Sequence, residues 1–201
     1  LKCCYKFRCQ LPDDVAFSIN PTEMIIHNKF VCDELINMDV IILEGNDKIS
    51  LLENIDTGTV IISAHGVSRK VRDYTLTKNI NLIDTTCPDV KKVHDNAIEY
   101  INKGYEVLYI GKKNHPEAIG VLEESDKIIL LDNIDMIKNI SKNKKYYVTN
   151  QTTLSHDYIN KFHEELKNNK IDVIIENNIC FATTKREKAL YNLKQKNDKA
   201  F

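Results

Sequence analysis

The sequence predicts an α/β protein with parallel, doubly wound sheets. Short apolar segments that suit buried strands alternate with amphipathic segments that suit helices, and polar turns separate them. A parallel strand pair needs a crossover connection, which a helix usually supplies. The alternation therefore indicates parallel rather than antiparallel sheets.

The first expected elements are a helix across residues 30–35 and buried strands at residues 60–64 and 81–84. Pro88 suits the first position of the next helix, and Gly104 ends that helix. The apolar residues of this helix recur with helical spacing and predict one buried face: Val90, Val93, Ala97, Ile98 and Ile101.

The same alternation continues to the end of the chain. The remaining elements follow in order: a strand at 105–110, a helix from His115 through Leu122, a strand at 127–131, a short helix near Met136, strands at 146–148 and 172–175, and a charged helix from about Thr183. Between the last two strands an apolar residue recurs every fourth position, which predicts a helix: Leu154, Tyr158, Phe162 and Leu166.

Composition excludes several classes of partner. Lys and Arg total 28 and Asp and Glu total 29, for a formal net charge of -1, which argues against a nucleic-acid-binding face. No run approaches the ~20 apolar residues that span a bilayer, so we expect no membrane association. Six cysteines without a CxxC pair favour a reducing compartment. The chain begins with Leu1 and ends without a stop signal, and we expect both ends to be cut.

Chemically distinctive residues follow the ends of several expected strands. In doubly wound sheets, reactive groups gather just beyond the carboxyl ends of the strands. The residues at these positions are, in chain order, His65, Cys87, His115, Thr152 and Cys180. This coincidence predicts a functional site assembled from several loops.

Cys87 and Cys180 each lie between a strand and a helix. Amide N–H groups at a helix start favour a thiolate, which could ligate a metal or act as a nucleophile. The alternative is a small buried side chain, the commoner fate of a free cysteine. Two converging thiolates would suit an iron–sulfur cluster or, less well, zinc. Cys32 lies within an expected helix and is interpreted as core packing.

Three histidines fall in turns and together could bind an anion, which suits a diphosphate better than a neutral metabolite: His27, His65 and His115. A single loop histidine is more often solvent-facing or structural. The other three fall on expected helices and are interpreted as structural: His94, His156 and His163.

Glu117 stands two residues after His115. A first-turn glutamate is usually a surface residue favoured by the helix dipole. In a buried pocket its pKa would instead be raised, and it could donate a proton. Thr152 or Thr153 would cap the helix that begins near Leu154.

Read in order, six blocks of the chain resemble the LytB/IspH family of 4-hydroxy-3-methylbut-2-enyl diphosphate reductases, and they span about residues 25–190. The blocks are Ile26-His27-Asn28-Lys29-Phe30, Ser63-Ala64-His65-Gly66-Val67-Ser68, Asp84-Thr85-Thr86-Cys87-Pro88 with Lys92-Val93-His94, His115-Pro116-Glu117, Gln151-Thr152-Thr153-Leu154-Ser155, and Cys180-Phe181-Ala182-Thr183-Thr184-Lys185-Arg186.

The resemblance implies similar α/β modules around a central cavity. Residues 1–86 would form the first, residues 87–176 the second, and residues 177–201 the start of a truncated third. It also implies a [4Fe-4S] cluster held by three cysteines, with Cys87 and Cys180 as two of the ligands. The substrate would be an allylic diphosphate, and the electron donor a ferredoxin or flavodoxin-type protein.

The resemblance further assigns roles to polar residues. The substrate diphosphate would be bound by His27, His65 and His115. Glu117 would relay the proton that lets the hydroxyl leave as water, with Thr152 placing that hydroxyl or the water.

The Asn-, Lys- and Ile-rich composition suits a plastid-type organelle (an apicoplast), whereas a bacterial protein would be cytoplasmic.

The chain departs from the family at both ends. The family's first cluster cysteine lies in a Gly-Phe-Cys segment, which Leu1-Lys2-Cys3-Cys4-Tyr5-Lys6-Phe7-Arg8-Cys9 replaces, and the Ser- and Asn-rich diphosphate motif would lie beyond Phe201. The third ligand is left unassigned, and this chain alone is expected to hold a cluster poorly.

The other hypotheses are a cysteine hydrolase using Cys87 with His65 or His115, a non-catalytic zinc-binding module, and an inactive fragment.

Overall fold

The computed structural model describes residues 16–20, 29–45 and 47–196. The chain divides into two compact units, Leu1–Cys87 (unit 1) and Pro88–Phe201 (unit 2). Within the described ranges each unit contains one four-stranded sheet, and every neighbouring strand pair is parallel. The predicted α/β class with parallel sheets is therefore confirmed. The third module and the central cavity stay predictions.

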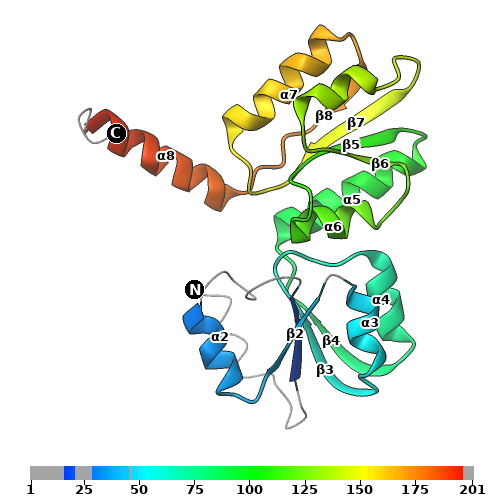
Figure 1. Ribbon diagram of the computed structural model, residues 1–201, viewed down its shortest axis with the longest axis vertical. Coiled ribbons are helices and arrows are strands. Elements are labelled where there is room, and N and C mark those ends of the chain that lie inside the picture. Colours follow the sequence, from blue (N-terminus) through cyan, green and yellow to red (C-terminus); the bar gives the residue numbers. More distant parts are fainter. Residues whose placement is uncertain (1–15, 21–28, 46, 197–201) are drawn as a thin grey trace. The chain divides into compact units, whose positions relative to one another are not determined.

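Unit 1 has the strand order β2-β1-β3-β4. Its elements are β1 (Ala16–Asn20), α2 (Lys29–Ile36), β2 (Ile41–Glu44), α3 (Lys48–Glu53), β3 (Thr57–Ile62), α4 (Arg69–Leu76) and β4 (Asn79–Asp84). Helices α3 and α4 lie together beside the sheet (Figure 1). They bury an apolar cluster that includes Leu52, Val60, Ile62 and Val71.

Unit 2 has the strand order β6-β5-β7-β8. Its elements are α5 (Pro88–Asn102), β5 (Glu106–Ile110), α6 (Pro116–Leu122), β6 (Ile128–Leu131), the 3-10 helix η1 (Ile134–Asn139), β7 (Lys145–Asn150), α7 (His156–Asn168), β8 (Asp172–Ile175) and α8 (Phe181–Lys196). The short helix expected near Met136 is thus a 3-10 helix, and α8 begins two residues before the expected Thr183.

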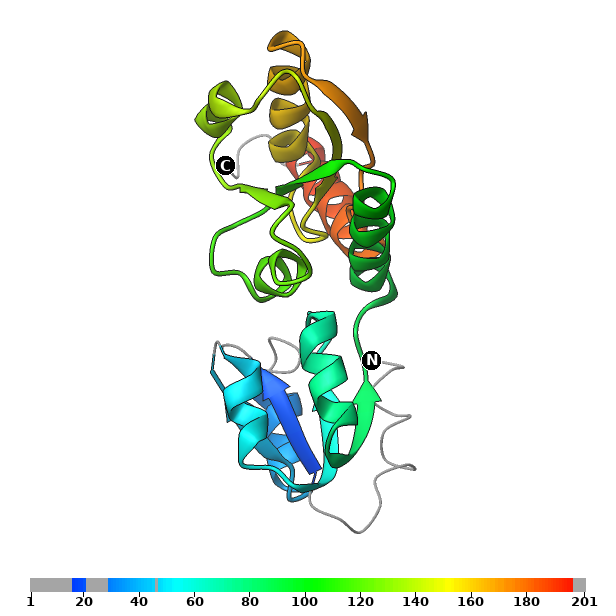
Figure 2. The same cartoon turned by 90° about the vertical axis from the view of Figure 1, so that its right-hand side faces the viewer.

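The central strands of unit 2 bury both faces. Successive side chains of a strand point to opposite faces of the sheet. Val107 and Tyr109 accordingly pack in the cluster of α5 and α6, whereas Leu108 and Ile110 pack in the cluster of α7 and η1. Figure 2 shows α5 and α7 on either side of this sheet. The same alternation places Tyr147 of β7 on the α5 face.

One expected helix begins later than predicted. Helix α7 starts at His156, and Ser155 is its N-cap, because the Ser155 side chain accepts a hydrogen bond from the Tyr158 N–H at 3.2 Å. Leu154 is 5% exposed and packs in the α7-face cluster without being helical. The spacing of Leu154 from the apolar residues of α7 therefore shows that it is buried on the same face, and not that it is helical. The expectation that Thr152 or Thr153 caps this helix is wrong.

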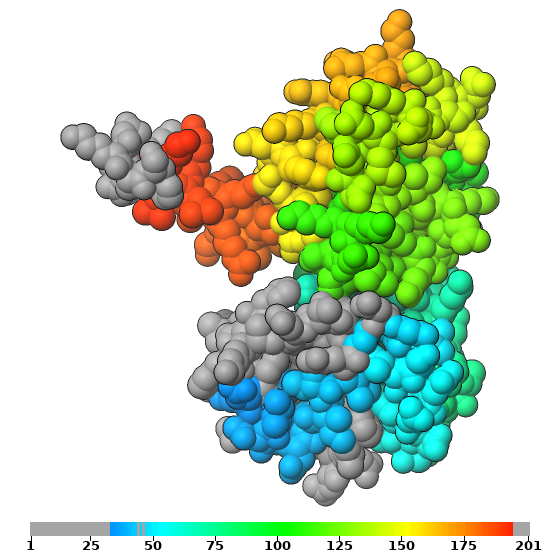
Figure 3. All heavy atoms as spheres, viewed as in Figure 1, coloured from blue at the N-terminus to red at the C-terminus, as the bar shows by residue number. Residues whose placement is uncertain are grey.

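Helix α8 extends away from the rest of unit 2 (Figure 3). Its first turns are tied to α7, since the Glu187 Oε1 accepts the His156 N–H at 3.2 Å. Several large apolar side chains of α8 are exposed: Phe181, Leu190, Tyr191 and Leu193.

The strand order of each unit creates a topological switch point. In unit 2 the chain passes from β5 to β6 at one edge and then returns to β7 on the other side of β5. The loops after β5 and β7 therefore leave the sheet in opposite directions, which is where doubly wound sheets bind ligands. In unit 1 the equivalent strands are β1 and β3.

Candidate functional site

The structure brings four of the sequence-predicted site residues together in unit 2. His115 and Glu117 follow β5, Thr152 follows β7, and Cys180 follows β8. His65 and Cys87 belong to unit 1. His27 lies outside the described residues.

Glu117 is the buried acid of this site. It is 1% exposed, although it lies in the first turn of α6. Its Oε1 accepts the Thr152 backbone N–H at 2.7 Å, and its Oε2 accepts the Thr152 Oγ1 hydroxyl at 2.9 Å. Thr152 is itself 2% exposed, so both contacts are protected from water.

Burial raises the pKa of Glu117 to about 7, even though the hydrogen bonds from Thr152 and Tyr109 act in the opposite direction. The nearby Asp89 carboxylate adds to the increase. An acid with a pKa near neutrality can hold a proton and release it at physiological pH. The arrangement therefore suits proton transfer.

Tyr109 completes the surroundings of Glu117, and sequence reasoning did not identify it. Its side chain is fully buried, and its hydroxyl donates to the Glu117 Oε1 at 3.4 Å. Burial raises the pKa of Tyr109 well above its usual value, and the Glu117 carboxylate adds to this, so the phenol stays protonated. Nothing in the sequence marks it, because a tyrosine within an apolar strand is typical of core packing.

Gly111 makes room for the Tyr109 ring. A Cβ at Gly111 would lie 2.5 Å from Tyr109 Cε1 and 3.0 Å from its Cδ1. The ring is enclosed and cannot yield easily, so Gly111→Ala is expected to destabilise unit 2 by about 1–3 kcal/mol. Displacing the phenol should also raise the pKa of Glu117, which ¹³C NMR of its carboxyl would measure.

Gly104→Ala is the matched control. Gly104 has φ +89 and open space around it, so alanine there meets only backbone strain of about 1–2 kcal/mol. The Glu117 titration should not change in this variant. An equal change of the Glu117 titration in Gly111→Ala and Gly104→Ala would contradict the role assigned to Gly111.

His115 caps α6 rather than lying free in its loop. Its Nδ1 accepts the Glu117 backbone N–H at 3.2 Å, and Pro116 occupies the first helical position. In the neutral imidazole the proton is then on Nε2, which makes Nε2 the donor. The cap thereby fixes a nitrogen donor close in sequence to the buried acid.

Cys180 is tied to the same loop as Glu117. Its backbone N–H donates to the Thr152 carbonyl at 2.9 Å. Thr152 therefore binds Glu117 through its N–H group and Cys180 through its carbonyl oxygen. The Cys180 Sγ accepts the Thr183 N–H at 3.4 Å at the start of α8.

The cysteine of unit 1 has an equivalent backbone contact. The Cys87 N–H donates to the Ala64 carbonyl at 3.0 Å. Ala64 lies two residues after β3, and Thr152 lies two residues after β7. Cys87 follows β4, the edge strand beside β3, and Cys180 follows β8, the edge strand beside β7. Cys87 and Cys180 are free of disulfides and partly exposed. The two units therefore present a cysteine in the same way.

His65 follows β3 in a tight turn. The Gly66 N–H donates to the Ser63 carbonyl at 3.1 Å, and Gly66 has φ 75, a conformation that favours glycine. The turn places the half-buried His65 next to Ala64, whose carbonyl holds Cys87. The three helical histidines lie on α5 and α7, and His94 pairs with Glu124 through Nδ1 at 2.8 Å.

Each unit offers one thiol that would fit a thiolate-bound cluster. Cys87 and Cys180 each lie directly before a helix, and a thiol at such a position suits iron–sulfur ligation. Among the described residues no group of three or more His, Cys, Asp or Glu side chains is arranged to hold a metal ion. A third ligand is accordingly not assigned.

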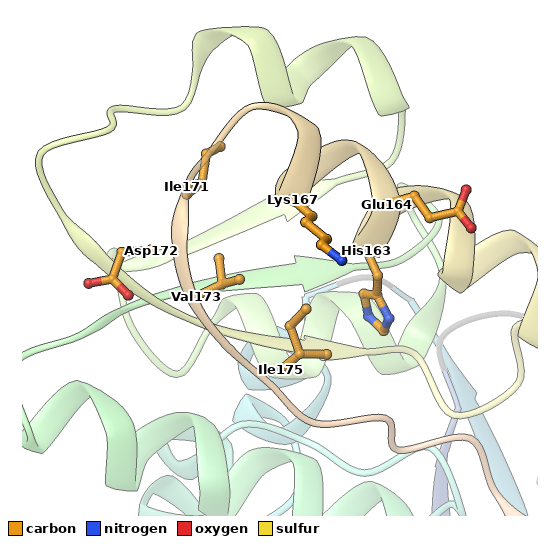
Figure 4. A pocket seen from close by; sticks show the side chains of 7 residues that line it. All are labelled: His163, Glu164, Lys167, Ile171, Asp172, Val173 and Ile175. Carbon is orange, nitrogen blue, oxygen red and sulfur yellow. The ribbon is translucent and has the colours of Figure 1, made fainter.

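A hollow of about 520 Å³ lies elsewhere in unit 2, between α7 and the edge strand β8. Figure 4 shows side chains that line it, including His163, Lys167 and Ile175. No predicted catalytic, substrate or metal-binding residue of the described ranges lines it.

In those same ranges no helix has the length and apolar character needed to cross a membrane.

Comparison with known proteins gives consistent matches. A family model described as LytB protein matches residues 10–201. The 4-hydroxy-3-methylbut-2-enyl diphosphate reductase of Symbiobacterium thermophilum is 41% identical over 169 residues, which are 83% of this chain and 57% of the relative. The protein of the same name from Bacillus subtilis is 39% identical over 177 residues, which are 87% of this chain and 56% of the relative.

A solved structure also matches. The E-1-hydroxy-2-methyl-but-2-enyl-4-diphosphate reductase from Plasmodium falciparum has a TM-score of 0.82 and 30% sequence identity, and the match covers 97% of this chain and 60% of that one. The chain spans little more than half the length of the curated relatives it matches.

Proposed function

The chain belongs to the LytB family, and we propose that the natural protein carrying it is a 4-hydroxy-3-methylbut-2-enyl diphosphate reductase that yields isopentenyl and dimethylallyl diphosphates. The observation that carries this proposal is the buried Glu117 carboxyl, with a pKa of about 7, bound on both oxygens by Thr152. An acid poised in this way suits a reaction in which a hydroxyl must leave as water.

The reaction replaces a C–OH bond by C–H and consumes two electrons and two protons, with water as the second product. In our proposal Glu117 delivers the proton that the departing hydroxyl needs, and the Thr152 hydroxyl orients that group. The substrate diphosphate is bound by His27, His65 and His115, which act as N–H donors to phosphate oxygens.

Cys87 and Cys180 are proposed as two ligands of a [4Fe-4S] cluster. When bound, such a cluster would supply electrons one at a time and an open iron able to act as a Lewis acid. The remaining steps belong to the chain itself: it holds the acid, excludes water from it and orients the leaving group. A ferredoxin or flavodoxin-type donor and an apicoplast or bacterial cytoplasmic location are part of the proposal.

The matches to reductases favour this function over the cysteine hydrolase and over the non-catalytic metal-binding module. The decisive test is turnover. The natural protein, reconstituted anaerobically with iron and sulfide and reduced by dithionite through methyl viologen, should convert 4-hydroxy-3-methylbut-2-enyl diphosphate to both products. Iron-loaded protein that leaves this substrate unchanged would reject the proposal.

The 201-residue chain by itself is expected to bind a cluster poorly, because no third ligand is assigned in it. Iron and sulfide analysis after the same reconstitution should give well under one cluster per chain. A stable, stoichiometric brown [4Fe-4S] species would show this expectation to be wrong and would place the missing ligand within these residues.

A further inference from the structure

A group of polar side chains that the proposed chemistry does not use holds the segment between β8 and α8. Glu176 directly follows β8, and its carboxylate accepts three hydrogen bonds. Lys92 Nζ lies 2.5 Å from Oε1, and Asn96 Nδ2 and the Tyr147 hydroxyl each lie 2.8 Å from Oε2. The donors come from α5 and β7, so one carboxylate joins a helix and a central strand to this segment.

The tyrosine donor is rigidly placed. Tyr147 is fully buried, and its ring stacks on Tyr100 of α5 with centroids 3.9 Å apart and planes 4° apart. Burial raises the pKa of Tyr147, and its hydrogen bond to Glu176 adds to this, so the hydroxyl remains a donor. Burial alone would raise the pKa of Glu176, but the hydrogen bonds from Lys92, Tyr147 and Asn96 lower it, so the acceptor stays charged.

The contacts continue along the segment toward Cys180. The Glu176 N–H donates to the Val148 carbonyl at 3.0 Å. The Asn178 N–H donates to Asn150 Oδ1 at 3.0 Å, and its Nδ2 donates to Thr149 Oγ1 at 2.9 Å. The Cys180 N–H then reaches the Thr152 carbonyl. Alternate residues 176, 178 and 180 are therefore fixed to β7 and the loop that follows it.

We propose that Glu176 is a positioning residue whose carboxylate, bound by Lys92, Asn96 and Tyr147, fixes the segment that places Cys180 beside Thr152. The inference rests on the proposed function of Cys180 as a metal ligand. A ligating side chain must be held within about 0.5 Å of its productive position, and a segment without secondary structure does not provide this by itself. The charge-assisted contacts of Glu176 supply the missing rigidity.

The test compares Glu176→Gln with Glu99→Gln in the 201-residue chain. Both replace a carboxylate that pairs with a lysine, but Glu99 pairs with Lys103, which follows the C-terminal end of α5, whereas Glu176 pairs with Lys92 near the start of that helix. Mass spectrometry would follow two quantities. Peptic peptides from acid-quenched samples report amide hydrogen exchange in residues 176–180, and tryptic peptides report alkylation of Cys180 by iodoacetamide relative to Cys87 in the same molecule.

In Glu176→Gln we expect exchange and Cys180 alkylation to rise on the order of tenfold, with Cys87 unchanged. Glu99→Gln should leave both quantities at the wild-type level. Cys87 is the internal reference, because a general loss of stability would expose both cysteines. An unchanged Cys180, or an equal rise at Cys87 and Cys180, would refute the positioning role.

Tyr147→Phe provides a second, milder variant if Glu176→Gln does not fold. It keeps the stack on Tyr100 and removes one of the three hydrogen bonds, so it should give a smaller rise at Cys180 and none at Cys87. An unaltered Cys180 in this variant would also count against the inference. Because these measurements use the metal-free chain, a natural protein that binds no iron would contradict the proposed function and leave the result on Glu176 intact.

Discussion

Replacing Glu117 by Gln is expected to make unit 2 more stable at about pH 8, by about 3 kcal/mol, while lowering turnover by roughly 10²–10⁴-fold. Glutamine has the same shape, its Oε1 can accept the Thr152 N–H, and its Nε2 can donate to the Thr152 hydroxyl. The substitution therefore removes a buried charge without leaving an unpaired group, but it also removes the acidic proton.

The stability gain depends on pH in a defined direction. The folded-state pKa of Glu117 is raised by burial from 4.5 to about 7. Below 4.5 the carboxyl is protonated in both the folded and the unfolded chain. Between 4.5 and about 7 the unfolded chain releases the proton and the folded chain keeps it, so wild-type stability falls as pH rises through this window. The Gln variant should lack this decrease.

Amide hydrogen exchange of β5 and β7 in increasing urea, at about pH 5 and about pH 8, would measure the free energy of unfolding of unit 2. Glu123→Gln is the matched control, because Glu123 is exposed at the end of the same helix. Its stability should follow wild type at both pH values. A Glu117→Gln variant that loses stability at the higher pH would contradict the assignment of a buried, costly charge.

Replacing Cys180 by Ser in the natural protein is expected to remove most of the bound iron and abolish turnover. A serine hydroxyl does not ionise as a thiol does and is a poor ligand for iron–sulfur iron. Cys87→Ser should have the same effect, and the double variant should add little, because ligands of one cluster act as a unit. Iron analysis, absorbance of the reconstituted protein and product formation would measure these effects.

Cys32→Ser is the control for thiol number. Cys32 lies on α2 and was interpreted from the sequence as packing rather than ligation. This variant should keep wild-type iron content and turnover. Iron retained at the wild-type level in Cys180→Ser would eliminate Cys180 as a ligand, whatever the outcome at Cys87.

Much of the fold of unit 2 was predictable from local pattern. The spacing of Val90, Val93 and Ala97 predicted the helix that α5 forms, and the predicted strand at residues 172–175 is β8 (Asp172–Ile175). In unit 1, the strands β1 and β2 and the helices α3 and α4 were not individually predicted. β1, β2 and α3 have four to six residues, which leaves few positions in which to detect a period, whereas α4 does carry amphipathic spacing.

The start of α7 shows a limit of periodicity. Leu154 has the spacing of the helix that follows, but it packs in the same core from a turn. Apolar spacing reports which face is buried, whereas the helix start is set by which side chain can reach the free N–H groups. Here Ser155 does so, and the competition between Ser155 and the two preceding threonines could not be decided from residue types alone.

The sequence by itself determined the α/β class, the positions of the chemically distinctive residues after the strand ends, and the family. All three depend on local pattern or on motif order, which the linear chain carries directly. Only the tertiary structure decided that Glu117 is buried against Thr152, 35 residues away, and that Lys92 meets Glu176, 84 residues away. Such contacts depend on which strand faces lie against which helices, and burial and pKa follow from that packing rather than from sequence spacing.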